Sequence, residues 1–114
     1  MSDATEVVIR DNAMANRYEA WEGEELAAVA EYRPAPNRLV FVHTEVLPAF
    51  AGRGIGSRLA RGALDATRAR GLRVTPRCPF IAAYIRGHPE YADMVVGARG
   101  TSPSRAPEGG SASG

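Results

Sequence analysis

The sequence feature that most constrains this fold is a change of hydrophobic period across a cluster of glycines. Residues 38–46, RLVFVHTEV, are rich in β-branched and aromatic residues, which is typical of a strand. Three glycines follow at alternate positions, Gly52, Gly54 and Gly56, and apolar residues then recur at helical spacing over residues 54–69. A glycine turn between a strand and a helix collects free backbone N–H groups at the helix N-terminus, so the sequence predicts an anion-binding site there.

The segments on either side of this unit predict a sheet. Short strands are expected at residues 7–10, 17–22, 25–33 and 72–76, and a second helix at residues 78–88. The Leu-Ala-Ala composition of residues 25–33 alone favours a helix, but the length of the segment and the preceding glycine favour a hairpin strand. The fold class expected is therefore α/β, with one mixed, mostly antiparallel sheet of about five strands, two main helices and one strand, helix, strand crossover.

Local rules predict further details of these elements. The PAP sequence at residues 34–36 should end the third strand, because proline donates no ladder hydrogen bond. Strict alternation along residues 38–46 should place side chains on two faces. One face would carry Phe41, His43 and Glu45, and the other Val40, Val42, Thr44 and Val46. In the second helix, Phe80, Ala83 and Tyr84 should share a face.

Length and composition indicate one small domain. Residues 1–96 are predicted to form it, and residues 97–114, rich in Gly, Ser and Pro, are predicted to be a disordered tail. No apolar run approaches the roughly 20 residues of a membrane span, and the acidic N-terminus is unlike a secretory signal, so a cytoplasmic protein without a membrane partner is expected. One cysteine and two histidines offer no metal-ligand cluster, so no metal is predicted.

Charge is divided unevenly along the chain. All fourteen basic residues are arginine, and residues 1–51 carry four of them with nine acidic residues. Residues 52–86, which begin at the glycine turn, carry eight arginines and one acidic residue. This distribution favours a polyanionic partner, either a nucleic acid or a phosphate-bearing small molecule. A P-loop is excluded because the chain has no lysine, and the glycine spacing is not that of a Rossmann dinucleotide motif.

Two linked motifs carry a resemblance to a known family. The segment HTEVLPAFAGRGIGSRLARGALDATRARGLRV resembles the acetyl-CoA-binding motif of the GNAT superfamily of N-acetyltransferases, in which a strand and a proline precede Arg/Gln-x-x-Gly-x-Gly/Ala at the start of a helix. The following TPRCPFIAAYIRGHPEYADM resembles the end of the short, single-domain GNAT-like group, with its Cys-Pro-Phe and His-Pro-Glu-Tyr sequences. The match covers residues 38–94 and departs from the consensus at Ala51, where the family has Arg or Gln.

The resemblance implies a GNAT-like domain that binds acetyl-CoA. Val46 and Leu47 would bond the pantetheine arm through their main chain, and residues 52–57 would bind the pyrophosphate through theirs. Arg53 could partly replace the side chain that is missing at Ala51. The cofactor-binding residues implied are Val46, Leu47, Gly52, Arg53, Gly54, Ile55, Gly56, Ser57 and Phe80.

Four side chains are candidates for the chemistry of acetyl transfer to an amine. His43 and Glu45 precede the glycine turn, where many GNAT enzymes keep a base; the alternative is a packed histidine and a surface carboxylate. Cys78 is expected at the N-terminus of the second helix, where the helix dipole favours a nucleophilic thiolate, and the resemblance places Cys-Pro-Phe beside the cofactor sulfur. The alternative for Cys78 is a buried structural thiol. Tyr84 could protonate the leaving thiolate or belong to the core.

Three functions remain open on the sequence. The first is an N-acetyltransferase that transfers acetyl from acetyl-CoA to a primary amine of a protein or a small molecule. The second is a CoA-binding module with little or no catalysis, which the alanine at position 51 allows. The third, nucleic-acid binding by the arginine-rich half, is weaker because aromatic residues are not interleaved with the arginines. An acceptor on an open surface, such as a protein amine, is expected because so short a chain has little room for a closed pocket.

Overall fold

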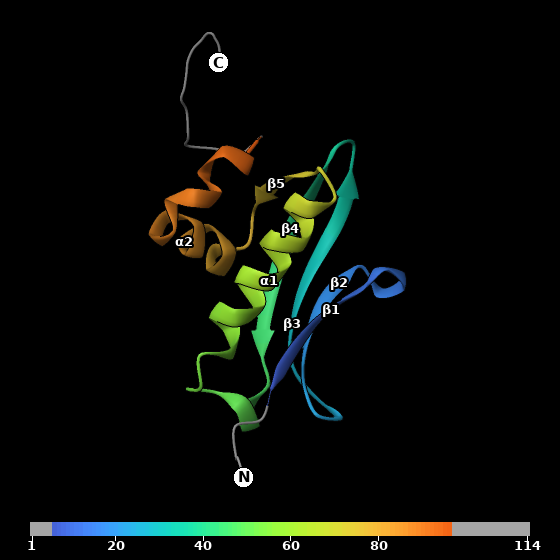
Figure 1. The fold of residues 1–114 in the computed structure, drawn as a ribbon, viewed down its shortest axis with the longest axis vertical. Coiled ribbons are helices and arrows are strands. Elements are labelled where there is room, and N and C mark those ends of the chain that lie inside the picture. The colour runs from blue at the N-terminus through green and yellow to red at the C-terminus, as the bar shows by residue number, and fades with distance from the viewer. Residues whose placement is uncertain (1–5, 97–114) are drawn as a thin grey trace, which may run out of the picture.

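One five-stranded sheet organises the computed structural model, which describes residues 6–96 (Figure 1). The strands are β1 (Val7–Asn12), β2 (Arg17–Glu22), β3 (Glu25–Ala35), β4 (Arg38–Val46) and β5 (Arg73–Pro76). They lie in chain order; the first four pair antiparallel, and β5 pairs parallel with β4. The helices are α1 (Ile55–Ala69) and α2 (Pro79–Gly87), with short 3-10 turns η1 (Ala13–Ala15), η2 (Pro48–Phe50) and η3 (Pro89–Met94). This arrangement confirms the predicted fold class.

The core lies between the sheet and the helices. α1 crosses the sheet, and α2 lies beside it against β4 and β5 (Figure 1). Under α1, the rings of Tyr18, Tyr32 and Phe41 pack with centroids 5.4 to 6.1 Å apart, and the helix contributes the buried Leu59 and Ala63. Helical spacing therefore identified the buried stripe of α1 correctly.

The other face of the sheet, which we call the open face, is covered by no helix of residues 6–96. On β2, Arg17, Glu19 and Trp21 stand at alternate positions and are joined by hydrogen bonds on this face. Glu19 accepts hydrogen bonds from the side chains of Asn12 at 2.9 Å, Arg17 at 2.8 Å and Trp21 at 2.9 Å. Burial acts to raise the pKa of Glu19, but these donors outweigh it and hold the pKa below its usual value.

A β-bulge in β4 interrupts the strict alternation predicted for residues 38–46. Glu31 of β3 pairs with His43, but the next residue, Tyr32, pairs with Phe41. Val42 is therefore the extra residue on β4, with no partner of its own on β3. The sequence carries no glycine or proline at this point, so the bulge had no local signal.

The bulge changes which side chains of β4 share a face. Phe41 points into the core and is fully buried, whereas His43 and Glu45 point to the open face and are exposed. Thr44 and Val46 instead point towards the helices, like their buried cross-strand partners on β3. The prediction that Phe41 lies on the same face as His43 and Glu45 is therefore wrong.

The third strand also continues past its predicted end. Pro34 pairs with Leu39 and Ala35 with Arg38, so β3 reaches the turn at Asn37. Pairing of β3 with β2 ends at Glu31, and beyond it that edge of β3 is free of a neighbouring strand. The backbone nitrogen of Pro34 faces this free edge. Its lack of an N–H group therefore removes no hydrogen bond between strands.

The second helix does not bury the face on which Phe80, Ala83 and Tyr84 lie together. Pro79 occupies the first turn as expected, and the side chains that enter the core are Ile81 and Ile85. Phe80 remains 40% exposed, and Tyr84 is half-buried. Phe80 is thereby left to line a groove instead of the core.

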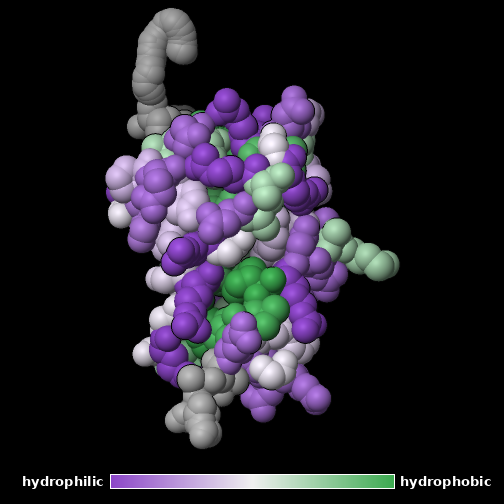
Figure 2. All heavy atoms as spheres, in the orientation of Figure 1, coloured by the Kyte–Doolittle hydropathy of each residue, from purple (hydrophilic) through white to green (hydrophobic). Residues whose placement is uncertain are grey.

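β1 approaches α1 closely because residue 62 has no side chain. A Cβ on Gly62 would lie 2.7 Å from Cγ1 of Ile9, closer than carbon atoms pack. Figure 2 shows hydrophobic surface gathered where β1 meets α1, and Val7 and Ile9 are the partly buried apolar side chains of that strand. The glycine therefore sets the distance between the helix and the edge strand.

The predicted disordered tail at residues 97–114 lies outside the described residues. Within residues 6–96, no helix is both long enough and apolar enough to cross a membrane.

Candidate functional site

The glycine turn between β4 and α1 is held in a conformation that favours glycine. Gly52 and Gly54 have φ angles of +79° and +75°, in the left-handed region that L side chains rarely adopt. Gly54 is also the N-cap of α1, and no side chain caps the helix there. The first backbone bond of α1 runs from the N–H of Arg58 to the carbonyl of Gly54 at 3.2 Å.

The N-terminus of α1 is therefore left with unused donors. Within the described chain, the N–H groups of residues 52–57 have no acceptor. No carboxylate lies in the first turn of the helix to offset its partial positive charge. These donors, and the small side chains around them, match what an anion such as a pyrophosphate needs.

A groove with a volume of about 240 Å³ opens at this turn. It is lined by Val46, Phe50, Ala51, Gly52, Gly54, Ile55, Gly56, Ser57 and Phe80. Phe80 of α2 lies directly over the helix start, since a Cβ on Gly56 would be 2.9 Å from Cζ of Phe80 and 3.3 Å from Cγ2 of Val46. Seven of the nine predicted cofactor residues thus line one groove, which we call the cofactor groove, and two do not.

Arg53 and Leu47 are the two predicted cofactor residues outside the groove lining. The guanidinium of Arg53 donates to Oε2 of Glu22 at 2.6 Å and stacks over Phe50, so it is held away from the helix N-terminus. The N–H of Leu47 donates to the carbonyl of Ala27 at 2.8 Å, and its own carbonyl accepts from Phe50 at 2.9 Å. Both main-chain groups of Leu47 therefore already make hydrogen bonds within the protein, and its role in cofactor binding stays a prediction.

The cofactor groove continues along an unpaired edge of β4. Pairing between β4 and β5 ends at Phe41 and Pro76, although β4 runs on to Val46. The carbonyl of Phe41 accepts from the N–H groups of both Arg77 and Cys78, where the chain turns away into α2. Beyond this point β4 exposes main-chain donors and acceptors along one edge, which an extended ligand can pair with.

Cys78 lies where the two strands separate, on the helix side of the sheet. Its Sγ is 3.3 Å from Oγ1 of Thr44, and the residue is 3% exposed. Cys78 is the N-cap residue of α2, as expected. The thiol is thus buried but adjacent to the unpaired edge of β4, and Thr44 is a neighbour that the sequence did not single out.

His43 and Glu45 lie on the opposite face of the same edge. Nε2 of His43 is 3.5 Å from Oε1 of Glu45, and each side chain is 55% exposed. Neither residue lines the cofactor groove. The structure therefore separates the four catalytic candidates by face, with Cys78 and Tyr84 on the helix side and the other two on the open face.

Tyr84 packs away from the cofactor groove. Its ring stacks on His88 with centroids 3.9 Å apart, and Nδ1 of His88 is 2.8 Å from the carbonyl of Tyr84. Burial raises the pKa of the Tyr84 hydroxyl. The contacts observed are those of a packed aromatic at the end of α2.

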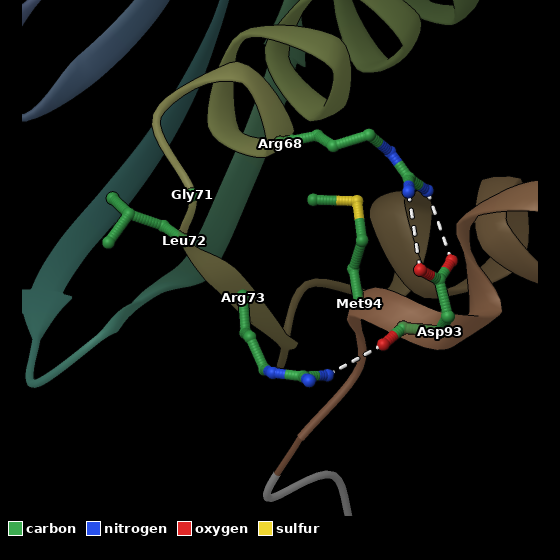
Figure 3. A pocket seen from close by; sticks show the side chains of 6 residues that line it. All are labelled: Arg68, Gly71, Leu72, Arg73, Asp93 and Met94. Carbon is green, nitrogen blue, oxygen red and sulfur yellow. Dashed lines mark hydrogen bonds and ion pairs between the residues drawn. The ribbon is translucent and has the colours of Figure 1, made fainter.

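A further hollow, of about 190 Å³, lies between the end of α1, the start of β5 and η3 (Figure 3). Its charged groups make hydrogen bonds and an ion pair with other groups of the protein. The guanidinium of Arg68 donates to both carboxylate oxygens of Asp93 at 3.0 and 3.2 Å, and Arg73 donates to the carbonyl of Asp93 at 2.7 Å. This hollow is a structural junction, and within residues 6–96 no cluster of three potential metal ligands occurs either there or elsewhere.

Comparison with known proteins agrees with this geometry. A family model described as GCN5-related N-acetyl-transferase matches residues 17–94, which is more than half of the chain. The chain belongs to the GCN5-related N-acetyltransferase family. The GCN5-related fold is also found in the NMR solution structure of a GCN5-like protein from Staphylococcus aureus, with a TM-score of 0.60 at 21% identity over 84% of this chain and 92% of that one. No curated protein sequence matches the chain significantly.

The groove lining also includes two residues that sequence reasoning missed. Phe50 and Ala51 line the cofactor groove without having been predicted as cofactor residues. The signal for Phe50 was weak, because an aromatic between Pro48 and the glycines gives no indication of its direction. It turns inward through the 3-10 turn η2 and is 5% exposed.

Proposed function

We propose that this protein is an acetyltransferase that binds acetyl-CoA in the cofactor groove and transfers the acetyl group to a primary amine. The observation that carries the proposal is the continuity between the unpaired edge of β4 and the uncapped N-terminus of α1. An extended arm along the first would bring a pyrophosphate to the second. Membership of the GCN5-related N-acetyltransferase family supports the same reading.

The residues present fit the cofactor in charge and in shape. Acetyl-CoA supplies the acetyl thioester and, in its pyrophosphate, an anion for the N–H groups of residues 52–57. The arm would pair with the main chain of Val46 and contact Phe80. Ala51 contributes no charged side chain, and Arg53 is paired with Glu22, so the pyrophosphate would depend on backbone donors.

Acetyl transfer needs a base for the acceptor ammonium and a proton for the leaving thiolate. In the proposed reaction the neutral amine would attack the thioester carbonyl; the C–N bond would form as the C–S bond breaks, and the proton lost from the nitrogen would balance the proton that the thiolate takes up from water. His43 at the exposed edge of β4 would remove the proton from the amine, and Glu45 at 3.5 Å would stabilise its charged ring. Burial of the Cys78 thiol against Thr44 favours a packing role over that of an acyl carrier.

The experiment that tests cofactor binding is an amide-resolved NMR titration with acetyl-CoA. Saturable shifts centred on residues 45–57 and 78–84 are expected. Gly54→Glu should abolish them, because it places a carboxylate at the helix N-terminus. Gly71→Glu is the matched control, since Gly71 has the same φ of +75° and equally open space at the other end of α1. Absence of shifts in the wild-type protein at millimolar acetyl-CoA would contradict the proposal.

A CoA-binding module without catalysis is the second candidate. The observation that favours it is the missing charged side chain at the turn, where Ala51 stands and Arg53 is occupied by Glu22. Turnover separates the two candidates, since only an enzyme releases free CoA faster when an acceptor amine is added. His43→Gln should reduce that release by roughly 10²-fold or more, and Cys78→Ser by much less.

A further inference from the structure

A second groove lies on the open face, apart from the cofactor groove. Its volume is about 320 Å³, and it is lined by Arg33, Val40, Val42 and Arg77. Val40 and Arg33 are cross-strand partners on β4 and β3. Val40 points to the open face because both of its neighbours in the strand are buried in the core. The groove therefore has an apolar floor with a guanidinium on each of two sides.

The arginines of this groove are free of carboxylates. Five other arginines form ion pairs, whereas neither Arg33 nor Arg77 makes an ion pair or a side-chain hydrogen bond within residues 6–96. Arg38 lies on the same face two residues before Val40, and its Nε is buried with no hydrogen-bond partner in that part of the chain. Unpaired guanidinium groups around a groove are the chemistry that binds a carboxylate or a phosphate.

The groove adjoins the place where transfer would occur. Val42 is the bulge residue immediately before His43, and Arg77 immediately precedes Cys78, at the point where β4 and β5 separate. On the other side of Val42 along the strands, the open face carries the carboxylates of Glu31 and Glu45. Charge therefore changes sign along this face, with arginines before the bulge and carboxylates after it.

We propose that the groove of Arg33, Val40, Val42 and Arg77 binds the acceptor and selects an amine that also carries an anionic group, a carboxylate or a phosphate. This inference rests on the proposed function and names its acceptor class. The anionic group pairs with the two guanidiniums, the carbon chain lies on the two valines, and the amino group points along β4 towards His43. A neutral amine lacks the first contact, and a lysine-rich segment is repelled by the arginines.

The test compares matched acceptors and matched variants. O-phosphoethanolamine is paired with ethanolamine, and β-alanine with propylamine, in an assay of CoA release. The KM of each anionic amine should be about tenfold lower than that of its neutral partner. The double variant Arg33→Ala/Arg77→Ala should remove this difference. Arg86→Ala removes a comparable exposed charge from the last turn of α2 and should leave it unchanged.

A binding measurement without acetyl-CoA keeps the inference separate from the proposed function. Titration with β-alanine or O-phosphoethanolamine should shift the amides of Val40 and Val42 in the wild-type protein and not in the double variant. Shifts from only one of the two probes would fix the anion as carboxylate or phosphate. Equal KM values for charged and neutral amines would overturn the inference. So would amide shifts in the double variant as large as those in the wild-type protein. Displacement of both probes by a single-stranded oligonucleotide with steep salt dependence would also overturn it, in favour of nucleic acid.

If the acetyl-CoA titration fails while the groove still binds the anionic amines, the proposed function falls and the anion site remains.

Discussion

At the scale of single residues, glycines serve two physical purposes in this protein. Gly52 and Gly54 provide positive φ angles, and nothing lies within 4 Å of the Cβ that either lacks. Gly56 and Gly62 are ordinary helical residues, and their missing Cβ makes room for Phe80 and Ile9. The first pair is needed for the backbone conformation and the second for packing. Substitutions should therefore strain the backbone at the first pair and create steric clashes at the second.

Gly62→Ala tests the packing purpose. The added Cβ would meet the stiff, β-branched Ile9 at 2.7 Å, so β1 must move off α1. We expect a loss of about 1–2 kcal/mol in the free energy of unfolding, after the gain in helix propensity of alanine over glycine is included. In an Ile9→Ala background the same change should be neutral or stabilising by up to about 1 kcal/mol. Urea denaturation of the four proteins in this cycle measures the coupling, and additive effects would contradict the contact.

Two tyrosines should make the protein sensitive to alkali. Burial, and then the hydrogen bonds to Asp11 and Asp65, raise the pKa of Tyr32 and of Tyr91 from 10 to about 12. A raised folded pKa means that this stabilisation is complete below pH 10 and is lost as the pH rises through 12. Phenolate absorbance should therefore show Tyr32 and Tyr91 ionising above pH 10, in a transition that coincides with unfolding.

Tyr32→Phe is the control for this alkaline transition. It removes the hydroxyl that donates to Asp11 at 2.6 Å, so it should take one group out of the late transition while Tyr91 remains in it. Ionisation of all four wild-type tyrosines near pH 10 would contradict the expected burial.

At the scale of elements, strands and helices were predicted correctly where the local sequence pattern matched the secondary structure that formed. The bounds of β2 and β4 were predicted to the residue, and those of α1 to within one residue, because alternation in β2, β-branched and aromatic composition in β4 and helical spacing in α1 are local signals. The prediction failed at Val42, since a bulge depends on how two strands register with each other and not on either one alone. The end of β3 was missed for a similar reason, because whether Pro34 is tolerated depends on where β2 stops.

The candidate site, too, was predictable from the sequence only where its features are local. The glycines and the helix start were recognisable in sequence, because the turn and the helical period are local. The separation of His43 and Glu45 from Cys78 by face was not, because it follows from the bulge. The groove at Arg33 and Arg77 was also hidden, since it joins residues from two segments that lie 44 positions apart in the chain.

The junction of α1 with η3 gives a prediction about acid stability (Figure 3). The two hydrogen bonds from Arg68 hold the pKa of Asp93 below its usual value of 3.8. A lowered folded pKa means that the pair stabilises the protein above that value and that its contribution is lost as the pH falls. Asp93→Asn should lower Tm slightly at neutral pH, and the difference should vanish in acid. Glu90, on the same turn, makes no ion pair within residues 6–96, so Glu90→Gln is the matched control; a Tm difference for Asp93→Asn that persists in acid would contradict the ion pair.

At the scale of the whole molecule, one layer of helices on one sheet leaves two candidate ligand-binding surfaces. The helix side carries the cofactor groove, and the open face carries His43, Glu45 and the arginine groove. Both adjoin the unpaired edge of β4, where β5 ends early. A fold of this size can thus present two ligands to each other from opposite sides without a closed pocket.

Acetyl-CoA should stabilise the whole domain by mass action. At ten times its Kd, a ligand that binds only the folded state adds about 1.4 kcal/mol. For a domain of this size that corresponds to a rise in Tm of roughly 6 to 11 °C, measurable by calorimetry. Gly54→Glu should lose the rise, while Gly71→Glu and the Arg33→Ala/Arg77→Ala double variant should keep it. Loss of the rise in the double variant would mean that the two grooves are not independent.

The donors that line the start of α1 belong to the main chain, and this has a consequence for mutational scanning. Truncating Arg53, Ile55 or Ser57 to alanine leaves every one of those N–H groups in place, and Ala51 is already an alanine. An alanine scan across the turn would therefore score most positions as tolerant. Changes that add a side chain or a negative charge would reveal the site, because the proposed binding depends on the direction of the backbone N–H groups and on the absence of side chains around them.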